Sequence, residues 1–132
     1  MTYWYTSALI FFLAEGRFAE IAGVTRPHAL TEFYATTTGK GFKVEEKTVR
    51  LKPQHAADLV KLLAAQLSFV NLEAAETAEA ISQGAAKHIL GGRTHDLLHV
   101  AAAQKSGATE IWTCNVPDFA GLSDIPLKNP AI

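Results

Sequence analysis

Short apolar segments alternate with longer helix-like segments along most of this sequence, and this alternation is what most limits the fold. Strand-like stretches rich in apolar or β-branched side chains cover residues 22–27, 68–72 and 108–114. Helix-like stretches are predicted over residues 8–16, 28–39, 53–67, 73–90 and 95–107. A helix that connects two strands brings the chain back to the end of the sheet where the first strand began, so the two strands run parallel. The sequence therefore predicts an α/β protein with a central, mainly parallel sheet covered by helices on both faces.

The composition fits one ordinary globular domain spanning residues 1–132. Hydrophobic residues make up 48% of the chain and charged residues 19%, and no repeat or linker divides it. A formal net charge of −1 provides no general attraction to nucleic acid. Cys114 is the single cysteine, so no intrachain disulfide forms and a reducing cytoplasm is expected. No apolar run reaches the roughly 20 residues that span a membrane, so no membrane contact is expected.

Three acidic residues are predicted beyond the carboxyl ends of strands, where a parallel sheet has its functional crevice. Glu32 lies in the helix after the first strand-like stretch, Asp96 in the first turn of a later helix, and Asp118 in the turn after residues 108–114. Carboxylate oxygens are ligands that Mg²⁺ and Mn²⁺ prefer. Each acid also has an ordinary interpretation, such as an exposed helix acid or a favourable charge at a helix N-terminus.

The stretch "THDLLH" contains a second metal-binding pattern, because His95 and His99 share one helix face. Zinc proteases use a related pattern with Glu as the base and a further ligand downstream. Asp96 is one methylene shorter than Glu, and no such downstream ligand pattern follows. We therefore interpret both histidines as neighbours of the site or as packing residues on the helix.

Two longer segments, "PHALTEFYATTTG" and "GGRTHDLLHVAAAQKSGATEIWTCNVPDFAGL", together resemble the PIN-domain family, in particular its small VapC-like toxins. The resemblance covers roughly residues 24–125, and it is most specific where a helix, a strand and a "T-x-N-x-x-D-F" turn follow one another. It implies a three-layer α/β/α sandwich and a ribonuclease that depends on Mg²⁺ or Mn²⁺. The implied metal-binding and catalytic residues are Glu32, Asp96 and Asp118, and the implied substrate-binding residues are Arg93, Thr113 and Asn115.

The family's first acidic residue, an Asp that normally follows the first strand, has no counterpart in this chain. In one alignment Tyr5 of "YTSALI" takes its place, and a phenol is neutral near pH 7 and a poor Mg²⁺ ligand. In a second alignment, which we favour slightly, the first strand is missing altogether and the opening residues belong to the following helix. Both alignments predict a site that lacks one ligand.

The resemblance implies three partners: RNA, a VapB-like antitoxin and a second copy of the chain in a homodimer. A basic run at residues 40–52, which includes Lys43 and Arg50, is either an ordinary solvated surface or a lip that holds RNA phosphates. Two functions remain open from the sequence. One is an endoribonuclease toxin impaired by the loss of a ligand, and the other is an inactive PIN-like module that binds an antitoxin or RNA.

Overall fold

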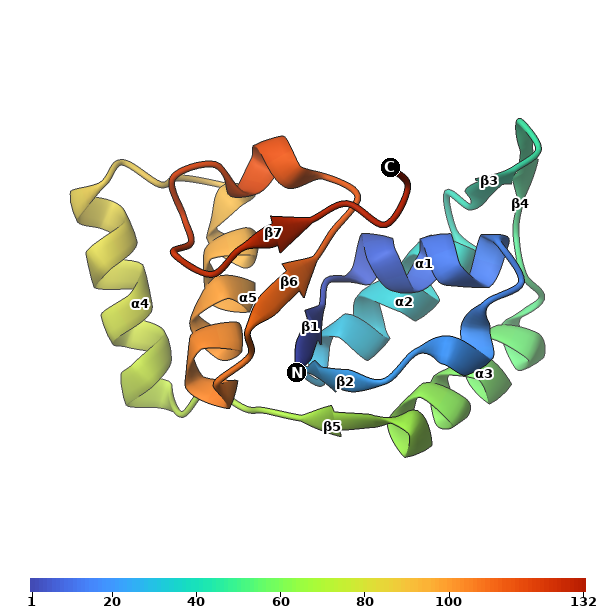
Figure 1. The fold of residues 1–132 in the computed structure, drawn as a ribbon, viewed down its shortest axis with the longest axis horizontal. Coiled ribbons are helices and arrows are strands. Elements are labelled where there is room, and N and C mark those ends of the chain that lie inside the picture. The colour runs from blue at the N-terminus through green and yellow to red at the C-terminus, as the bar shows by residue number, and fades with distance from the viewer.

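A parallel sheet of five strands forms the centre of the protein in the computed structural model, which describes residues 1–132 (Figure 1). The strand order is β5-β2-β1-β6-β7, and every neighbouring pair is parallel. The predicted parallel sheet is therefore confirmed, and β7 extends it by a strand that was not predicted. The strands are β1 (Thr2–Trp4), β2 (Gly23–Thr25), β5 (Leu67–Phe69), β6 (Glu110–Trp112) and β7 (Leu127–Lys128).

Helices cover both faces of this sheet and make three layers, as predicted (Figure 1). Adjacent side chains of a strand point to opposite faces, so Tyr3 joins a hydrophobic cluster with α5 while Trp4 joins a second cluster with α1, α2 and α3. The helix α4 packs on α5. The helices are α1 (Thr6–Ala14), α2 (His28–Thr38), α3 (Pro53–Gln66), α4 (Ala74–Ala86) and α5 (Arg93–Ser106), with short 3₁₀ turns η1 (Phe18–Glu20) and η2 (Val116–Phe119).

The first strand is present, and it occupies the middle of the sheet. β1 pairs with β2 on one side and β6 on the other, with Tyr3 opposite both Val24 and Ile111. Gly23 makes the first of these pairings possible, because a Cβ at this position would collide with the carbonyl oxygen of Thr2. The alignment without a first strand, which the sequence favoured slightly, is therefore wrong, and Tyr5 directly follows the central strand.

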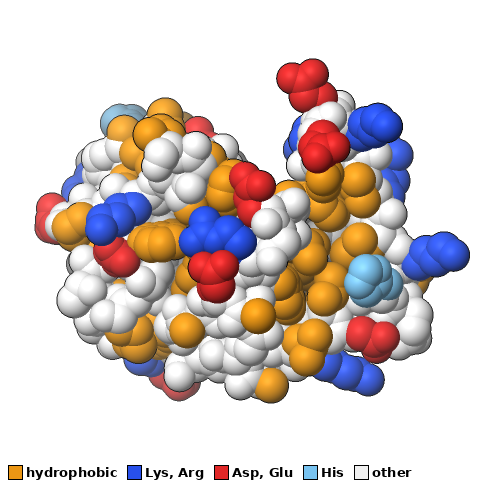
Figure 2. Space-filling view, turned by 45° about the vertical axis from the view of Figure 1, so that its right-hand side comes forward, with side chains coloured by type: hydrophobic (Ala, Val, Ile, Leu, Met, Phe, Trp, Pro, Cys, Tyr) orange, Lys and Arg blue, Asp and Glu red, His pale blue; other side chains and the backbone are white.

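Residues 40–52 form an arm built on a two-stranded hairpin. The strands β3 (Phe42–Val44) and β4 (Lys47–Val49) pair antiparallel in a hairpin that stands away from the body (Figures 1 and 2). None of residues 40–52 is buried. Glu45 and Glu46 at the tip have φ of 50° and 66°, a left-handed conformation that L-residues adopt at a cost. The arm therefore gains little stability from the core.

Neither α1 nor α5 has a side-chain hydrogen bond at its N-cap. α1 has Tyr5 as its N-cap, while the side chains of Thr6 and Ser7 bond to residues of other elements. α5 starts at Arg93 with Gly92 as its N-cap, so Thr94 lies in the first turn. No helix in the structure is both long enough and apolar enough to cross a membrane.

Candidate functional site

The carboxyl ends of the central strands and the N-termini of α2 and α5 lie at the same edge of the sheet. Tyr5 follows β1 and Thr113 follows β6, because parallel strands end on one side. Glu32 lies in the second turn of α2, and Asp96 lies in the first turn of α5. The sequence placed Glu32 and Asp96 at this edge, and the hydrogen bonds described below join both residues to one network.

Tyr5 contacts Asp96 directly. Its hydroxyl donates a hydrogen bond to Oδ1 of Asp96 over 2.8 Å. The ring is held edge-on between His99 and Phe119, with centroid separations of 4.7 and 4.9 Å. Burial, together with the hydrogen bond to Asp96 and its charge, raises the pKa of Tyr5 far above its ordinary value, so the phenol keeps its proton. Burial also raises the pKa of Asp96, although the Tyr5 hydrogen bond opposes this shift.

Glu32 receives two hydrogen bonds on one oxygen. The hydroxyl of Thr6 donates to its Oε1 over 3.0 Å, and Nε2 of His99 lies 2.8 Å from the same atom. Burial by itself raises the pKa of this carboxyl, but the bonds from His99 and Thr6 outweigh it, and the pKa lies below its ordinary value. Glu32 is therefore a carboxylate near neutral pH.

His99 connects Glu32 to the core. Its side chain is fully buried, and Nδ1 lies 2.7 Å from the hydroxyl of Tyr3. Burial lowers the pKa of His99, so the ring is neutral near pH 7. A neutral ring has one donor and one acceptor, which assigns Nε2–H as the donor to Glu32 and Nδ1 as the acceptor from Tyr3. The sequence interpretation of His99 as a neighbour or packing residue missed this contact, although its position three residues after Asp96 puts both on one helix face.

Thr113 and Asn115 form a turn beside this network. Thr113 is buried, and its Oγ1 accepts the backbone N–H of Asn115 over 3.0 Å and lies 3.3 Å from Oγ of Ser7. The same Ser7 oxygen accepts the backbone N–H of Cys114 over 2.9 Å. Thr113 therefore fixes the backbone of the turn after β6, and Asn115, which is exposed, lies at its outer side.

Asp118 and Arg93 lie at the rim of the site. Asp118 is exposed on η2, and its charge raises the pKa values of both Tyr5 and Asp96. Nη2 of Arg93, at the start of α5, donates to the carbonyl oxygen of Ala120 over 3.1 Å. In this arrangement Arg93 braces the segment after η2.

The three acids do not fit the metal ion that the resemblance implies. No group of three His, Cys, Asp or Glu side chains in the structure could hold a metal ion. Moreover, Oε1 of Glu32 already accepts from His99 and Thr6, and Oδ1 of Asp96 accepts from Tyr5. At these two oxygens a cation would compete with hydrogen-bond donors of the protein itself. What the arrangement does chemically is hold two carboxylates in fixed, hydrogen-bonded positions.

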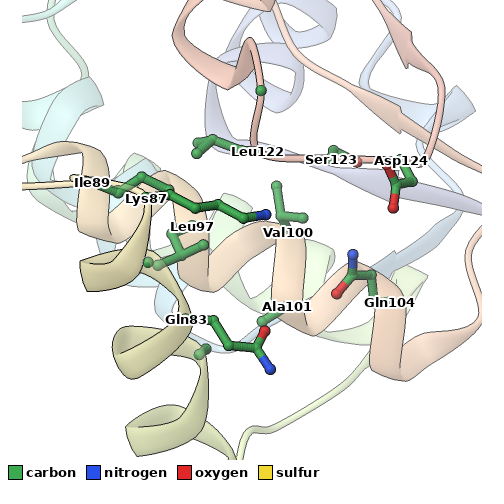
Figure 3. Close-up of a pocket in the computed structure, with 13 residues that line it drawn as sticks. Gln83, Lys87, Ile89, Leu97, Val100, Ala101, Gln104, Leu122, Ser123 and Asp124 are labelled. Atoms are coloured by element: carbon green, nitrogen blue, oxygen red, sulfur yellow. The ribbon is translucent and has the colours of Figure 1, made fainter.

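A cavity of about 220 Å³ lies on a different side of α5 (Figure 3). Leu97, Val100 and Ala101 of α5 line it together with Lys87 and Asp124. None of its lining residues belongs to the network of Tyr5, Glu32, Asp96 and His99. It is therefore separate from the carboxyl-edge site.

Comparison with solved structures supports the fold. The chain is similar to the structure of VapBC-1 from nontypeable Haemophilus influenzae, with a TM-score of 0.64, 14% sequence identity and 98% coverage of each chain. Neither a protein-family model nor a curated protein sequence matches the chain. Similarity at this identity concerns the fold alone. By its fold, the chain is a PIN-like three-layer α/β/α sandwich around a parallel sheet of five strands.

Proposed function

We propose that this chain is a toxin–antitoxin component of the VapBC kind that binds a VapB-like antitoxin and does not cleave RNA with a divalent metal ion. The hydrogen bond from the Tyr5 hydroxyl to Asp96 carries this proposal. A phenol that keeps its proton supplies no negative charge for Mg²⁺ or Mn²⁺, and its hydrogen bond occupies one of the two oxygens of Asp96. The similarity to VapBC-1 over nearly the whole chain supports the choice of partner.

The absence of metal-dependent cleavage can be tested with a labelled, structured RNA. We expect no difference between incubation of the purified chain with Mn²⁺, with Mg²⁺ and with EDTA. The control is Asp96→Asn, which should behave like the unaltered chain. Cleavage that requires Mn²⁺ and disappears in Asp96→Asn would contradict the proposal.

That contradictory result would instead support an impaired endoribonuclease. Two observations favour this second function. Glu32 and Asp96 lie at the same carboxyl edge of the sheet, and Asp118 is close enough for its charge to raise the pKa of Asp96. In it, these three carboxylates hold the ion, Arg93 contacts a phosphate, and Thr113 and Asn115 line the rim. Such a site requires the Tyr5–Asp96 bond to open, so its activity would be low.

Partner binding is tested by co-expression of the chain with a VapB-like protein. Size-exclusion chromatography with light scattering should show a single complex that contains both proteins. We also propose a homodimer, so the chain alone should have a measured mass of twice that of the monomer.

RNA binding through the arm is a separate proposal. It predicts that neutralising Lys43 and Arg50 together flattens the salt dependence of RNA binding, because fewer phosphate contacts release fewer counterions. An unchanged slope would argue against an RNA-binding arm.

A further inference from the structure

The cavity beside α5 combines apolar side chains with two charged side chains of opposite sign (Figure 3). Its apolar lining includes Leu97, Val100 and Ala101 of α5. Lys87, at the end of α4, and Asp124, in the segment after η2, supply the charges. None of the ion pairs in the structure includes Lys87 or Asp124. Both charges are therefore available to the groups of a ligand.

The end of α4 positions Lys87 at the cavity. Lys87 is the C-cap of this helix, and the next residue, His88, has a φ of 57°. The backbone N–H of Ile89 then donates to the carbonyl oxygen of Gly84 over 2.9 Å, a bond typical of the Schellman motif. Figure 3 shows the Lys87 side chain extending along the cavity toward Val100. Its ammonium group therefore faces the cavity.

Asp124 lies on a turn that the neighbouring Ser123 holds in place. The Ser123 hydroxyl donates to the carbonyl oxygen of Ile125 over 3.1 Å and accepts the backbone N–H of Ile125 over 2.9 Å. The carboxylate of Asp124 and the amide of Gln104 point toward each other at this end of the cavity (Figure 3). The negative charge thus comes from a different segment of the fold than the positive charge.

We infer that this cavity binds a small zwitterion, namely an aliphatic α-amino acid such as L-valine. Lys87 binds the carboxylate and Asp124 binds the ammonium group. The aliphatic side chain packs on Leu97, Val100 and Ala101. A ligand with a single charge is attracted by one of the two charged residues and repelled by the other, whereas a zwitterion complements both.

The size of the cavity restricts the ligand further. Its volume of about 220 Å³ is smaller than the roughly 300–1,000 Å³ of sites that take drug-sized ligands. Gly84 of α4 and Leu97 of α5 both line it, and a Cβ at Gly84 would lie only 2.4 Å from Cδ2 of Leu97. The two helices are therefore in contact at this part of the lining. A free amino acid matches this volume better than a nucleotide or a peptide does.

The first experiment titrates the isotope-labelled full chain with L-valine and follows the backbone amide signals by NMR. We expect the shifts to concentrate at the end of α4, along α5 and in residues 121–124. Two analogues test the recognition of each charge: isobutylamine lacks the carboxylate of valine, and 3-methylbutanoate lacks its ammonium group. Each should bind roughly tenfold more weakly or less, because one charged partner is missing. Equal binding of all three, or no shifts at millimolar valine, would overturn the inference.

The second experiment repeats the valine titration with Lys87→Met and Asp124→Asn. Each variant should lose roughly tenfold or more of the affinity. Both residues are exposed, so the fold should be retained. The matched controls, Lys61→Met and Asp58→Asn, change exposed residues of α3 and should bind like the unaltered chain. An unchanged affinity in either cavity variant, or an equal loss in its control, would overturn the inference.

Ala101→Phe tests the cavity itself, because the larger side chain fills it. Circular dichroism establishes that the variant is folded, and the folded variant should no longer bind valine. If it does not fold, the variants of Lys87 and Asp124 still decide the question. Retained binding by folded Ala101→Phe would contradict the inference. None of these measurements involves RNA or an antitoxin, so their failure leaves the proposed function unaffected.

Discussion

His99 is the residue on which the buried polar network depends. Both ring nitrogens have partners, the Tyr3 hydroxyl and the Glu32 carboxylate, and its side chain is fully buried. His99→Ala removes one hydrogen-bond partner from the Tyr3 hydroxyl and one from the Glu32 carboxylate, and it leaves a cavity. Because each unsatisfied buried group costs about 1–3 kcal/mol, we expect the free energy of unfolding to fall by about 3 kcal/mol or more, measured by urea denaturation.

His95→Ala is the matched control for this substitution. His95 is on the same helix, one turn earlier, and its side chain is exposed. Its ring stacks on that of His28 with centroids 5.9 Å apart, and only its backbone forms hydrogen bonds, with the N–H donating to the carbonyl oxygen of Gly92. We expect a change within about 0.5 kcal/mol, as is usual at exposed positions. Similar losses in both variants would show that the network contributes little to stability.

The arm formed by β3 and β4 is the element in which local strain has a measurable effect. Its tip places Glu45 and Glu46 in the left-handed region, whereas two-residue hairpin turns of this kind favour Asn-Gly. The double substitution Glu45→Asn and Glu46→Gly should stabilise the hairpin by about 1 kcal/mol or more, since each L-residue in this conformation costs about that much. Hydrogen exchange of the hairpin amides should then slow roughly fivefold or more.

Exchange of the α5 amides provides the internal control for the arm. No residue of the arm is buried, so its opening is expected to be independent of the core. The α5 amides should keep their rates in the double variant. Equal slowing in the arm and in α5 would show that the arm unfolds only with the whole domain.

At the scale of the whole molecule, stability should depend on pH through His99. Burial lowers the pKa of His99 below its ordinary value of 6.5. As the pH falls below 6.5, the unfolded chain takes up a proton that the native protein does not, so the free energy of unfolding decreases. Above this pH neither state holds the proton, and the contribution is constant. Urea midpoints at intervals from pH 8 to 5.5 should therefore be flat at first and then decline.

His99→Gln separates this effect from the other histidines. It keeps an amide donor that can reach a hydrogen-bond partner, and it has no titrating ring. The decline below pH 6.5 should disappear in this variant if His99 is its source. An equal decline in both proteins would assign the pH dependence to another group.

The sequence by itself determined the layout of the fold. Helix and strand patterns are local, so the apolar periodicity over residues 28–39, 53–67 and 95–107 was enough to predict α2, α3 and α5. The alternation of these helices with strands required a parallel sheet, and the parallel sheet placed Glu32 and Asp96 at its carboxyl edge. This reasoning needs no knowledge of which distant residues touch.

The tertiary structure decided what the site became, because contacts between residues far apart in the chain leave little local pattern. β1 is only three residues long, and its central place is defined by its pairing with β2 and β6. The partners of Glu32 include Thr6, 26 residues earlier, and His99, 67 residues later. Tyr5 reaches Asp96 across 91 residues. The sequence could show that an acid was missing, but only folding placed a phenol proton among the remaining carboxylates.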